Sequence, residues 1–382
     1  MAVTRKTLTR LVETLPSEYY YDPDHYEREL DAFWYRHWIC VGSSAAVAAP
    51  RSFRVVELGD QSIVITRDEA SQLHAFHNTC RHRGSILCEH VSGQFNGGRI
   101  VCPYHAWTYT LEGELERTPR RLPSDDFDFA NFPLYRVGVS EWAGFLFINL
   151  DEQHTASAQQ ALGNVPALFE NWKLDDTTVG HHMHVDLDCN WKVFWENFDE
   201  CYHCPGVHPE LCQVIPLYGN GWVSVTDNPD WQPDEQTSAN PEPRLAPDAR
   251  TWSMDGGSVA PEFEHLTKQQ RRAGHTYGVS PPSCFMVAHV DYARMVYLLP
   301  LGPEKTRLDV TWLLNPLTAA DPNARIEDII ALGKLVVEQD GRACELNQRG
   351  LRSRRFGSGV LVPQEYHIAD FHDWIRAGLK LD

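Results

Sequence analysis

The sequence predicts an α+β fold in which a small antiparallel β domain precedes a larger domain with a curved antiparallel sheet flanked by helices. Short runs rich in β-branched and aromatic residues, separated by turn residues, follow one another between about residues 41 and 152. Beyond residue 153, segments with helical periodicity alternate with further strand-like runs. Each of these two parts also contains one cluster of cysteine, histidine or acidic residues.

The composition narrows the classes of function. A chain of 382 residues is long enough for two or three domains. Its formal net charge of -18 argues against nucleic-acid binding, which depends on cationic side chains. No apolar run reaches the ~18 residues of a membrane helix, and the N-terminus lacks the apolar core of a signal peptide. We therefore expect a cytoplasmic protein without membrane contact, whose ten cysteines are mostly thiols.

The first 40 residues are expected to form a helical segment that packs on the larger domain. Pro23 and Asp24 open it, and apolar residues then recur at helical spacing: Tyr26, Leu30, Phe33 and Trp34. Residues 41–152 are expected to form the β domain, with strands near 53–58, 62–66 and 73–76 and one more buried strand within 137–150.

The β domain contains two arms that each offer one thiol and one imidazole. The first is Cys80-x-His82, and the second, after nineteen residues, is Cys102-x-x-His105. A Rieske [2Fe–2S] centre needs this mixture, because two histidines replace two cysteines on one iron. A structural zinc site also uses two Cys and two His, but it usually pairs Cys with Cys and His with His. The order Cys then His in both arms favours the iron–sulfur interpretation.

Residues 153–382 are expected to form the second domain. A helix should include Ala161, Leu168 and Trp172, and strands should cover 287–290, 295–299 and 308–313. A late helix should span 327–347, and the tail with Phe371 and Trp374 should form another. The irregular segment 220–262 is either a lid or a surface loop.

His181, His182 and His184 invite a metal interpretation. Strand alternation places His182 and His184 on one face, yet the sequence supplies no third ligand for them. An ordinary strand is the favoured interpretation.

The second cluster lies between residues 189 and 211. Trp191, Phe194, Trp195 and Phe198 are predicted as the buried side of a helix. Glu196, Glu200 and His203, at i, i+4 and i+7, are predicted to share another face. Pro205-Gly206 should interrupt this helix, so that His208 returns toward His203. Two histidines and one carboxylate are the ligands of a mononuclear iron(II) oxygenase site, and the third ligand must come from elsewhere.

Cys201 and Cys204 flank His203 in a C-x-x-C arrangement. A second zinc site or a redox pair is conceivable for such a spacing. No other cysteine pair lies nearby in the sequence, so packing as small apolar side chains is the favoured interpretation.

These motifs together resemble the α subunit of Rieske non-haem iron oxygenases, from about residue 17 to the C-terminus. The runs N-x-C-R-H-R-G, C-P-Y-H-A-W-x-Y and ENFDECYHCPGVHPEL carry the resemblance. It implies that Cys80, His82, Cys102 and His105 hold the cluster. It also implies that His203, His208 and Asp340 hold iron, where spacing alone would leave Asp340 a solvated helix carboxylate. Glu200 matches the family's acidic position between the two metals. Glu345 is the next candidate for the third iron ligand if Asp340 is not that ligand.

The resemblance implies a terminal oxygenase that receives electrons from a separate flavin- and NAD(P)H-dependent reductase. The chain itself has no dinucleotide-binding G-x-G-x-x-G in a βαβ context. The family also implies a ring-shaped homotrimer in which electrons pass between chains.

The substrate is predicted from the branch that these runs most resemble, the glycine betaine monooxygenases. A quaternary ammonium substrate needs an aromatic cage, for which Trp222, Trp231, Trp252, Tyr277 and Phe285 are available. Hydroxylation of an aromatic ring is the alternative, because the same side chains suit a flat substrate.

Two functions of other classes remain open from the residues alone. A Rieske ferredoxin would need only residues 41–152, and a zinc-stapled binding module would need no iron. Metal analysis separates them: cluster iron alone supports the carrier, zinc supports the module, and one further iron per chain supports the oxygenase.

Overall fold

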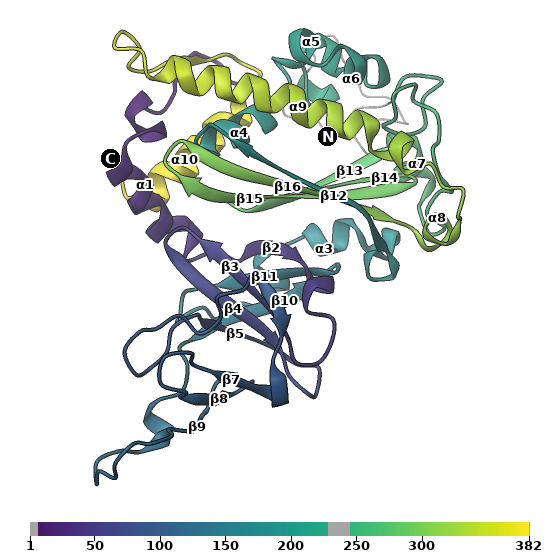
Figure 1. Ribbon diagram of the computed structural model, residues 1–382. Helices are drawn as coiled ribbons and strands as arrows, with labels where there is room; N and C mark the ends of the chain where they lie inside the picture. Colours follow the sequence, from purple (N-terminus) through teal and green to yellow (C-terminus); the bar gives the residue numbers. More distant parts are fainter. Residues whose placement is uncertain (1–6, 228–244, 382) are drawn as a thin grey trace. The chain divides into compact units, whose positions relative to one another are not determined.

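The computed structural model describes residues 7–227 and 245–381. The chain forms two compact units, which are described separately (Figure 1). The smaller unit is Phe33–Gly163, and the larger unit joins the first 32 residues to Asn164–Asp382. The α+β prediction is confirmed, since both antiparallel sheets and helices are present.

The smaller unit is built on a seven-stranded antiparallel sheet with the order β2-β11-β10-β5-β4-β3-β6. Its strands are β2 Ile39–Ser43, β3 Ser52–Leu58, β4 Gln61–Arg67, β5 Leu73–His77, β6 Ser92–Gln94, β10 Arg136–Trp142 and β11 Phe145–Asn149. A three-stranded sheet holds β7 Arg99–Val101, β8 Thr108–Thr110 and β9 Leu115–Arg117. The short helix α2, Ala158–Ala161, also belongs to this unit.

The single strand predicted within residues 137–150 is wrong. The structure has a hairpin instead, in which β10 and β11 pair with Trp142 opposite Phe145. Ala143 and Gly144 form its two-residue turn, both with positive φ, which matches the twist of paired strands. The sequence rule misses this turn because alanine rarely takes that conformation.

The larger unit is built on a five-stranded antiparallel sheet with the order β12-β16-β15-β14-β13. Its strands are β12 Thr178–Leu187, β13 His275–Ser280, β14 Cys284–His289, β15 Tyr292–Gly302 and β16 Lys305–Leu314. The three strands predicted after residue 280 are confirmed. His181, His182 and His184 lie in β12, and His182 Nε2 contacts Asp309 Oδ1 at 3.0 Å, so the strand interpretation holds.

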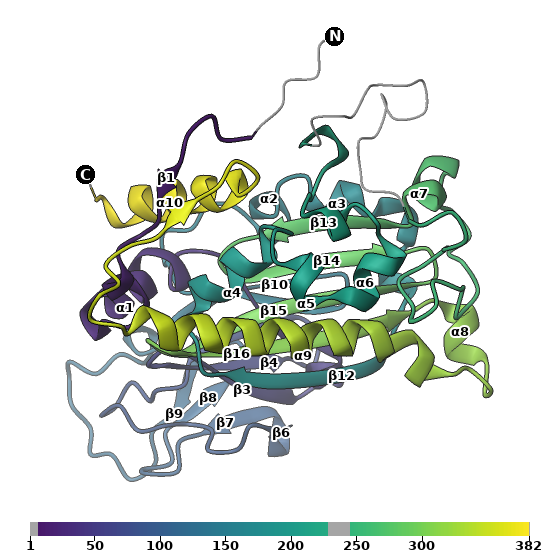
Figure 2. The ribbon, with the colours of Figure 1, turned by 90° about the horizontal axis from the view of Figure 1, so that it is seen from above.

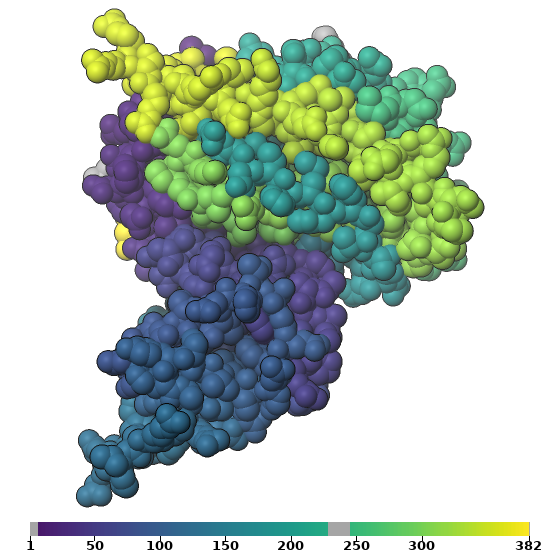
Figure 3. Space-filling model, in the orientation of Figure 1, coloured from purple at the N-terminus to yellow at the C-terminus, as the bar shows by residue number. Residues whose placement is uncertain are grey.

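Helices cover one face of this sheet. The longest, α9, spans Ile326–Leu351 and runs along the sheet (Figures 1 and 2). Its solvent side lies at the surface of this unit in the space-filling view (Figure 3). The other helices of the unit are α1 Pro23–Glu29, α3 Val165–Leu168, α4 Trp191–Phe198, α5 Cys204–Val207, α6 Pro209–Val214, α7 Lys268–Ala273, α8 Pro316–Ala320 and α10 Tyr366–Leu379.

The predicted late and C-terminal helices are confirmed as α9 and α10. The helix predicted around Ala161, Leu168 and Trp172 is instead a series of short turns, α2, α3 and a 3-10 turn at Glu170–Trp172. Within the described part of the chain, no helix is long and apolar enough to cross a membrane.

A buried ion pair fixes the N-terminal helix α1 to the larger unit. Glu29 Oε1 contacts Lys192 Nζ at 2.6 Å, and both side chains are fully buried. Glu29 Oε2 also accepts a hydrogen bond from Trp191 Nε1, and Asn190 Oδ1 accepts one from Lys192 Nζ. The charges are thus satisfied, which is what keeps a buried ion pair from being destabilising.

Candidate metal centres

The two Cys/His arms of the smaller unit form loops with the same backbone hydrogen bonds. In the first loop Gly84 N donates to Cys80 O, and Cys80 N donates to Ser85 O. In the second, Ala106 N donates to Cys102 O, and Cys102 N donates to Trp107 O. Gly84 and Ala106 occupy the matching position and both have positive φ. The two loops therefore share one backbone hydrogen-bond pattern, although the histidine follows the cysteine by two residues in the first loop and by three in the second.

The cysteines and the histidines of these loops differ in burial. Cys80 and Cys102 are buried, whereas His82 and His105 are exposed and their ring centroids lie 4.7 Å apart. Trp107 stacks on His82 at 4.8 Å, and Tyr109 Oη lies 3.2 Å from Cys80 Sγ. Two buried thiols facing two exposed imidazoles fit the donor set of a Rieske cluster.

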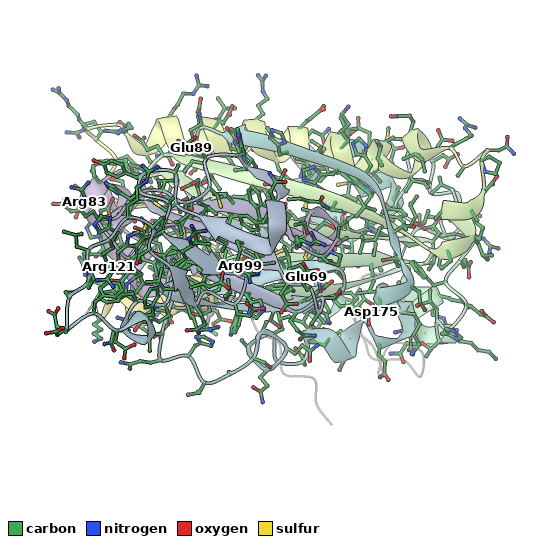
Figure 4. The ribbon with its side chains drawn as sticks, turned by 60° about the horizontal axis from the view of Figure 1, so that its bottom comes forward. Glu69, Arg83, Glu89, Arg99, Arg121 and Asp175 are labelled. Atoms are coloured by element: carbon green, nitrogen blue, oxygen red, sulfur yellow. A yellow bond between two sulfur atoms is a disulfide. The ribbon has the colours of Figure 1, made fainter. Side chains whose placement is uncertain are left out.

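Arg83 lies beside the second histidine. Its Nη2 atom donates to His105 Nε2 at 3.2 Å, and its guanidinium lies 4.9 Å from the centroid of the Tyr104 ring. Figure 4 shows Arg83 at the periphery of the molecule. The histidine edge of this loop pair is thus the accessible side of the site.

In the larger unit, His203, His208 and Asp340 bring three ligand atoms together. His208 Nε2 lies 2.8 Å from Asp340 Oδ1 and 3.1 Å from His203 Nε2. His203 Nε2 lies 3.5 Å from the same carboxylate oxygen. All three ligand atoms fall within 4.8 Å of one another, which is suited to one metal ion. Two imidazoles and one carboxylate on one side fit the facial arrangement used for iron(II).

The local backbone explains how the two histidines meet. Asn190 caps α4, and the helix ends at Phe198, so residues 199–202 form an irregular connection. His203 is the N-cap of the short helix α5, and His208 stands between α5 and α6. The histidines are therefore at the two ends of a single helical turn, with their ring centroids 5.1 Å apart and their rings edge-on to each other.

The prediction that Glu196, Glu200 and His203 share one helical face is wrong. Because α4 ends at Phe198, the helical spacing does not continue to His203. Glu196 instead accepts a hydrogen bond from Tyr20 at 2.5 Å and contacts His372 Nε2 at 2.9 Å. Pro205 does not interrupt a helix either; it stands in the first turn of α5, where proline is tolerated.

Glu200 contacts the first histidine through both of its carboxylate oxygens. Oε1 lies 2.5 Å from His203 Nδ1, and Oε2 accepts the His203 backbone N–H at 3.0 Å. An Nδ1–H donated to a carboxylate leaves the Nε2 lone pair for a metal.

Gln339 has the same role for the second histidine and was not singled out from sequence. Its Oε1 lies 2.8 Å from His208 Nδ1, and its Nε2 donates to Glu210 at 3.0 Å. Only its place directly before Asp340 could have drawn attention to it. Glu345, the alternative to Asp340, does not belong to the group of His203, His208 and Asp340, and it accepts the backbone N–H of Asp188.

Cys201 and Cys204 form a disulfide, which corrects the expectation that they pack as apolar thiols. The loop between α4 and α5 places their Cα atoms 4.9 Å apart, within the range that a disulfide requires. Both residues line the same pocket as His203. A C-x-x-C spacing is compatible with a disulfide. The expectation of two thiols rested on the lack of a second cysteine pair nearby in the sequence, which does not bear on a bond between these two residues.

A pocket of about 330 Å³ opens onto the three ligands. Its lining includes six aromatic residues: Phe194, Phe198, Tyr218, Trp252, Tyr277 and Phe285. Phe198 and Phe285 stack at 3.9 Å, and Tyr277 lies edge-on to Phe198 at 5.9 Å. Of the aromatic residues proposed from sequence, Trp252, Tyr277 and Phe285 are brought to the pocket. Trp222 is not part of the lining, and Trp231 lies outside the described residues.

Asp199 adds an acidic group to the pocket wall. Burial, together with the negative charges of Glu196 and Asp370, raises the pKa of Asp199 to about 8. This carboxyl group is therefore protonated near neutral pH, and it was not recognised from the sequence.

Comparison with protein families identifies the class. Residues 174–380 match the ring hydroxylating alpha subunit (catalytic domain) family, and residues 37–133 match the Rieske [2Fe-2S] domain. The first match covers more than half of the chain, which therefore belongs to the ring-hydroxylating α subunit family. The protein is a Rieske non-haem iron oxygenase, and its cofactors are a Rieske [2Fe–2S] cluster and a mononuclear iron.

Several similar proteins are named for quaternary ammonium substrates. The glycine betaine monooxygenase oxygenase subunit of Chromohalobacter salexigens is 30% identical, over 94% of this chain and 84% of that protein. The chloroplastic choline monooxygenase of Spinacia oleracea is 28% identical, over 96% of this chain and 78% of its own. The crystal structure of the quaternary ammonium Rieske monooxygenase CntA with its substrate L-carnitine is 25% identical, covers 96% of both chains and has a TM-score of 0.70.

Proposed function

We propose that this chain is the oxygenase component of a monooxygenase that hydroxylates an N-methyl group of a small quaternary ammonium compound. The observation that carries the proposal is the aromatic-lined pocket that opens onto His203, His208 and Asp340. The π faces of aromatic rings attract a quaternary ammonium cation. The relatives named for glycine betaine, choline and carnitine support the same substrate class.

In this proposal the cluster and the mononuclear iron are held by separate sets of residues. Cys80, His82, Cys102 and His105 would hold the cluster in a domain of residues 41–152. His203, His208 and Asp340 would hold the iron in a domain of residues 153–382, on which the first 40 residues pack. When bound, the cluster supplies single electrons and the iron supplies an open coordination position for oxygen.

The overall reaction balances with two electrons. One oxygen atom of O2 enters a C–H bond of the N-methyl group, and the other is reduced to water with two electrons and two protons. The resulting N-hydroxymethyl cation releases formaldehyde, a proton and the demethylated amine. The electrons come from a separate NAD(P)H-dependent reductase, because the sequence has no dinucleotide-binding motif of its own.

The residues around the site prepare it for this reaction. Glu200 accepts the Nδ1–H of His203, and Gln339 accepts the Nδ1–H of His208, so that both Nε2 lone pairs face the space beside Asp340. The stacked rings of Phe198 and Phe285 exclude water from the pocket and position the substrate cation.

We infer a cyclic homotrimer from the family resemblance, with Glu200 placed to couple the two metals across a subunit boundary. A head-to-tail interface closes into such a ring. Light scattering on the purified protein checks the assembly, and a monomer with full turnover would contradict it.

The function is tested with purified enzyme, a surrogate reductase and NADH. Betaines, choline and aromatic acids are supplied in turn, and formaldehyde, diol and phenol products are measured. We expect formaldehyde in proportion to the quaternary ammonium consumed. A diol or phenol from an aromatic acid, with no formaldehyde from any betaine or choline, would favour ring hydroxylation instead.

A further inference from the structure

This inference rests on the proposed function and concerns which quaternary ammonium compounds fit the pocket. Arg294 on β15 lines the pocket, although only 5% of its surface is exposed. Its Nε atom is buried and has no hydrogen-bond partner among the described residues. No carboxylate within the described part of the chain forms an ion pair with it. A buried charge without a partner is unusual, because charges removed from water are normally paired.

The sheet register places Arg294 on the face of the sheet that lines the pocket. Arg294 pairs with Val287 of β14, which pairs in turn with Tyr277 of β13. Side chains alternate along a strand, so Val296 faces the same side as Arg294. All four side chains line the pocket. The Arg294 side chain thus belongs to the wall of the pocket that the sheet forms.

Helix α9 forms the opposite wall and gives the separation from the metal ligands. A Cβ atom at Gly333 would lie 2.6 Å from Arg294 Nη1, so the guanidinium lies directly against the helix at this glycine. Asp340 follows seven residues later, two turns along the same helical face, which is roughly 10 Å along the axis. The pocket therefore has a cation at one end and the three metal ligands at the other.

The groups behind Arg294 do not neutralise it. Burial lowers the pKa of His275 to about 4, and burial followed by the charge of Arg294 lowers the pKa of His289 well below its usual value. Both histidines are therefore uncharged. Trp252, whose ring centroid lies 5.6 Å from the guanidinium carbon, offers only its π face. Within residues 7–227 and 245–381, the charge of Arg294 is thus left for a ligand.

We propose that Arg294 binds a carboxylate of the substrate, so that the preferred substrates are zwitterions carrying both a quaternary ammonium and a carboxylate. A guanidinium matches a carboxylate with two parallel hydrogen bonds. Tyr277 and Phe285 lie in the same pocket and supply π faces for the ammonium. A trimethylammonium alcohol lacks the anion and leaves Arg294 unpaired, which disfavours its binding.

Four probes separate the two recognition elements. Glycine betaine has the cation and the carboxylate, and choline has only the cation. The isostere 3,3-dimethylbutyrate has only the carboxylate, and 3,3-dimethylbutan-1-ol has neither. Their binding is measured by calorimetry on the oxidised holoenzyme without reductase. We expect wild-type enzyme to bind glycine betaine at least about 100-fold more tightly than choline, the range for a buried charge pair.

Variants at Arg294 test the residue itself. Arg294→Gln should weaken glycine betaine and 3,3-dimethylbutyrate by about 100-fold and change choline by less than about threefold. Arg294→Lys should recover part of the loss, because a point charge replaces the fork. Arg307→Gln is the matched control, since Arg307 on β16 pairs with Asp186 outside the pocket, and it should change no probe.

Two further measurements keep the proposal testable if the Arg294→Gln variant does not fold. The wild-type ratio of glycine betaine to choline needs no mutation, and a ratio near one would overturn the proposal. Gly333→Ala pushes against the guanidinium and should weaken the carboxylate probes selectively. Equal losses for all four probes in Arg294→Gln would also overturn it.

The proposed function fails in a different way. If 3,3-dimethylbutyrate binds as well as glycine betaine and no probe yields formaldehyde, the quaternary ammonium assignment is wrong. The carboxylate role of Arg294 is then judged from the carboxylate probes alone.

Discussion

The two candidate metal centres of this protein are built in different ways. In the smaller unit all four proposed ligands lie within residues 80–105, on two loops with the same hydrogen bonds. In the larger unit the ligands come from a short helical turn and from α9, with His208 and Asp340 132 residues apart in sequence. The first centre depends on local backbone geometry, whereas the second depends on how a long helix packs on the sheet and α5.

The surroundings of the two centres differ as well. His82 and His105 are exposed, which suits a group that exchanges electrons with a partner. His208 is only 2% exposed and is held by Gln339, which suits a site that must exclude water. The comparison teaches that a surface centre needs little beyond its own loops, while a buried centre recruits orienting residues from other elements. The predictions below test this contrast.

The largest effect is expected for Asp340→Ala. It should abolish turnover and remove the mononuclear iron, because two imidazoles alone form an incomplete site. The visible absorbance of the cluster should remain, since the two centres share no ligand. Iron analysis and absorbance on one sample check this. Glu338→Ala, an exposed carboxylate on the same helix, is the control. Full activity in Asp340→Ala would place the third ligand elsewhere.

The cluster in the smaller unit is tested by two changes, His82→Cys and His105→Cys. Each should eliminate the Rieske electron-paramagnetic signal, because the imidazoles set the charge and asymmetry of the cluster. The mononuclear site should still bind one iron. His90→Cys replaces an exposed histidine of the same unit and serves as the control. Unchanged spectra in both variants would contradict the cluster assignment.

Glu200→Gln tests whether the two centres are coupled. Both carboxylate oxygens accept hydrogen bonds from His203, and an amide offers only one acceptor oxygen, so one of these bonds is lost. We expect both metals to stay bound while reoxidation of the reduced cluster by oxygen and substrate slows by about 10–100-fold. Single-turnover absorbance measures this, with Glu345→Gln as the control. Reoxidation at the wild-type rate would make Glu200 a positioning residue only.

The smallest effect is a pH-dependent change in stability from Asp199→Asn. The pKa of Asp199 is raised by burial to about 8, whereas an unfolded aspartate has a pKa near ~3.9. The folded state therefore retains a proton that the unfolded state releases, and the wild type loses stability as the pH rises through this window. Asparagine does not titrate. The melting temperature of the variant should match that of the wild type at pH 4.5. It should exceed it at pH 8.5, by on the order of 2–4 °C for each kcal/mol of stability that the wild type loses.

A difference in melting temperature that stays constant between pH 4.5 and 8.5 would contradict the raised pKa. Asp373→Asn, an exposed aspartate on α10, controls for the loss of one surface charge.

The sequence by itself determined the local features. The two Cys/His arms were readable because their spacing and flanking residues encode two short loops whose hydrogen bonds close within six residues. The strands β14 to β16 and the helix α9 followed from apolar periodicity, because each buries one regular face. His203 and His208 were predicted from the histidine and carboxylate ligands of an iron(II) site and from the family resemblance. The expected path of the chain, a helix that continues to His203, was wrong, because His203 begins a separate helical turn.

Only the tertiary structure decided the features that join distant segments. The roles of Gln339 and Arg294 depend on which face of α9 and which strand of the sheet meet at the pocket. Glu196 was expected to share a helical face with Glu200 and His203, but α4 stops at Phe198. Tyr20 and His372, each 176 residues away in sequence, contact Glu196 instead. Periodicity reports which side of an element is buried. It does not report what is packed against that side, and that packing sets the charge and shape of the pocket.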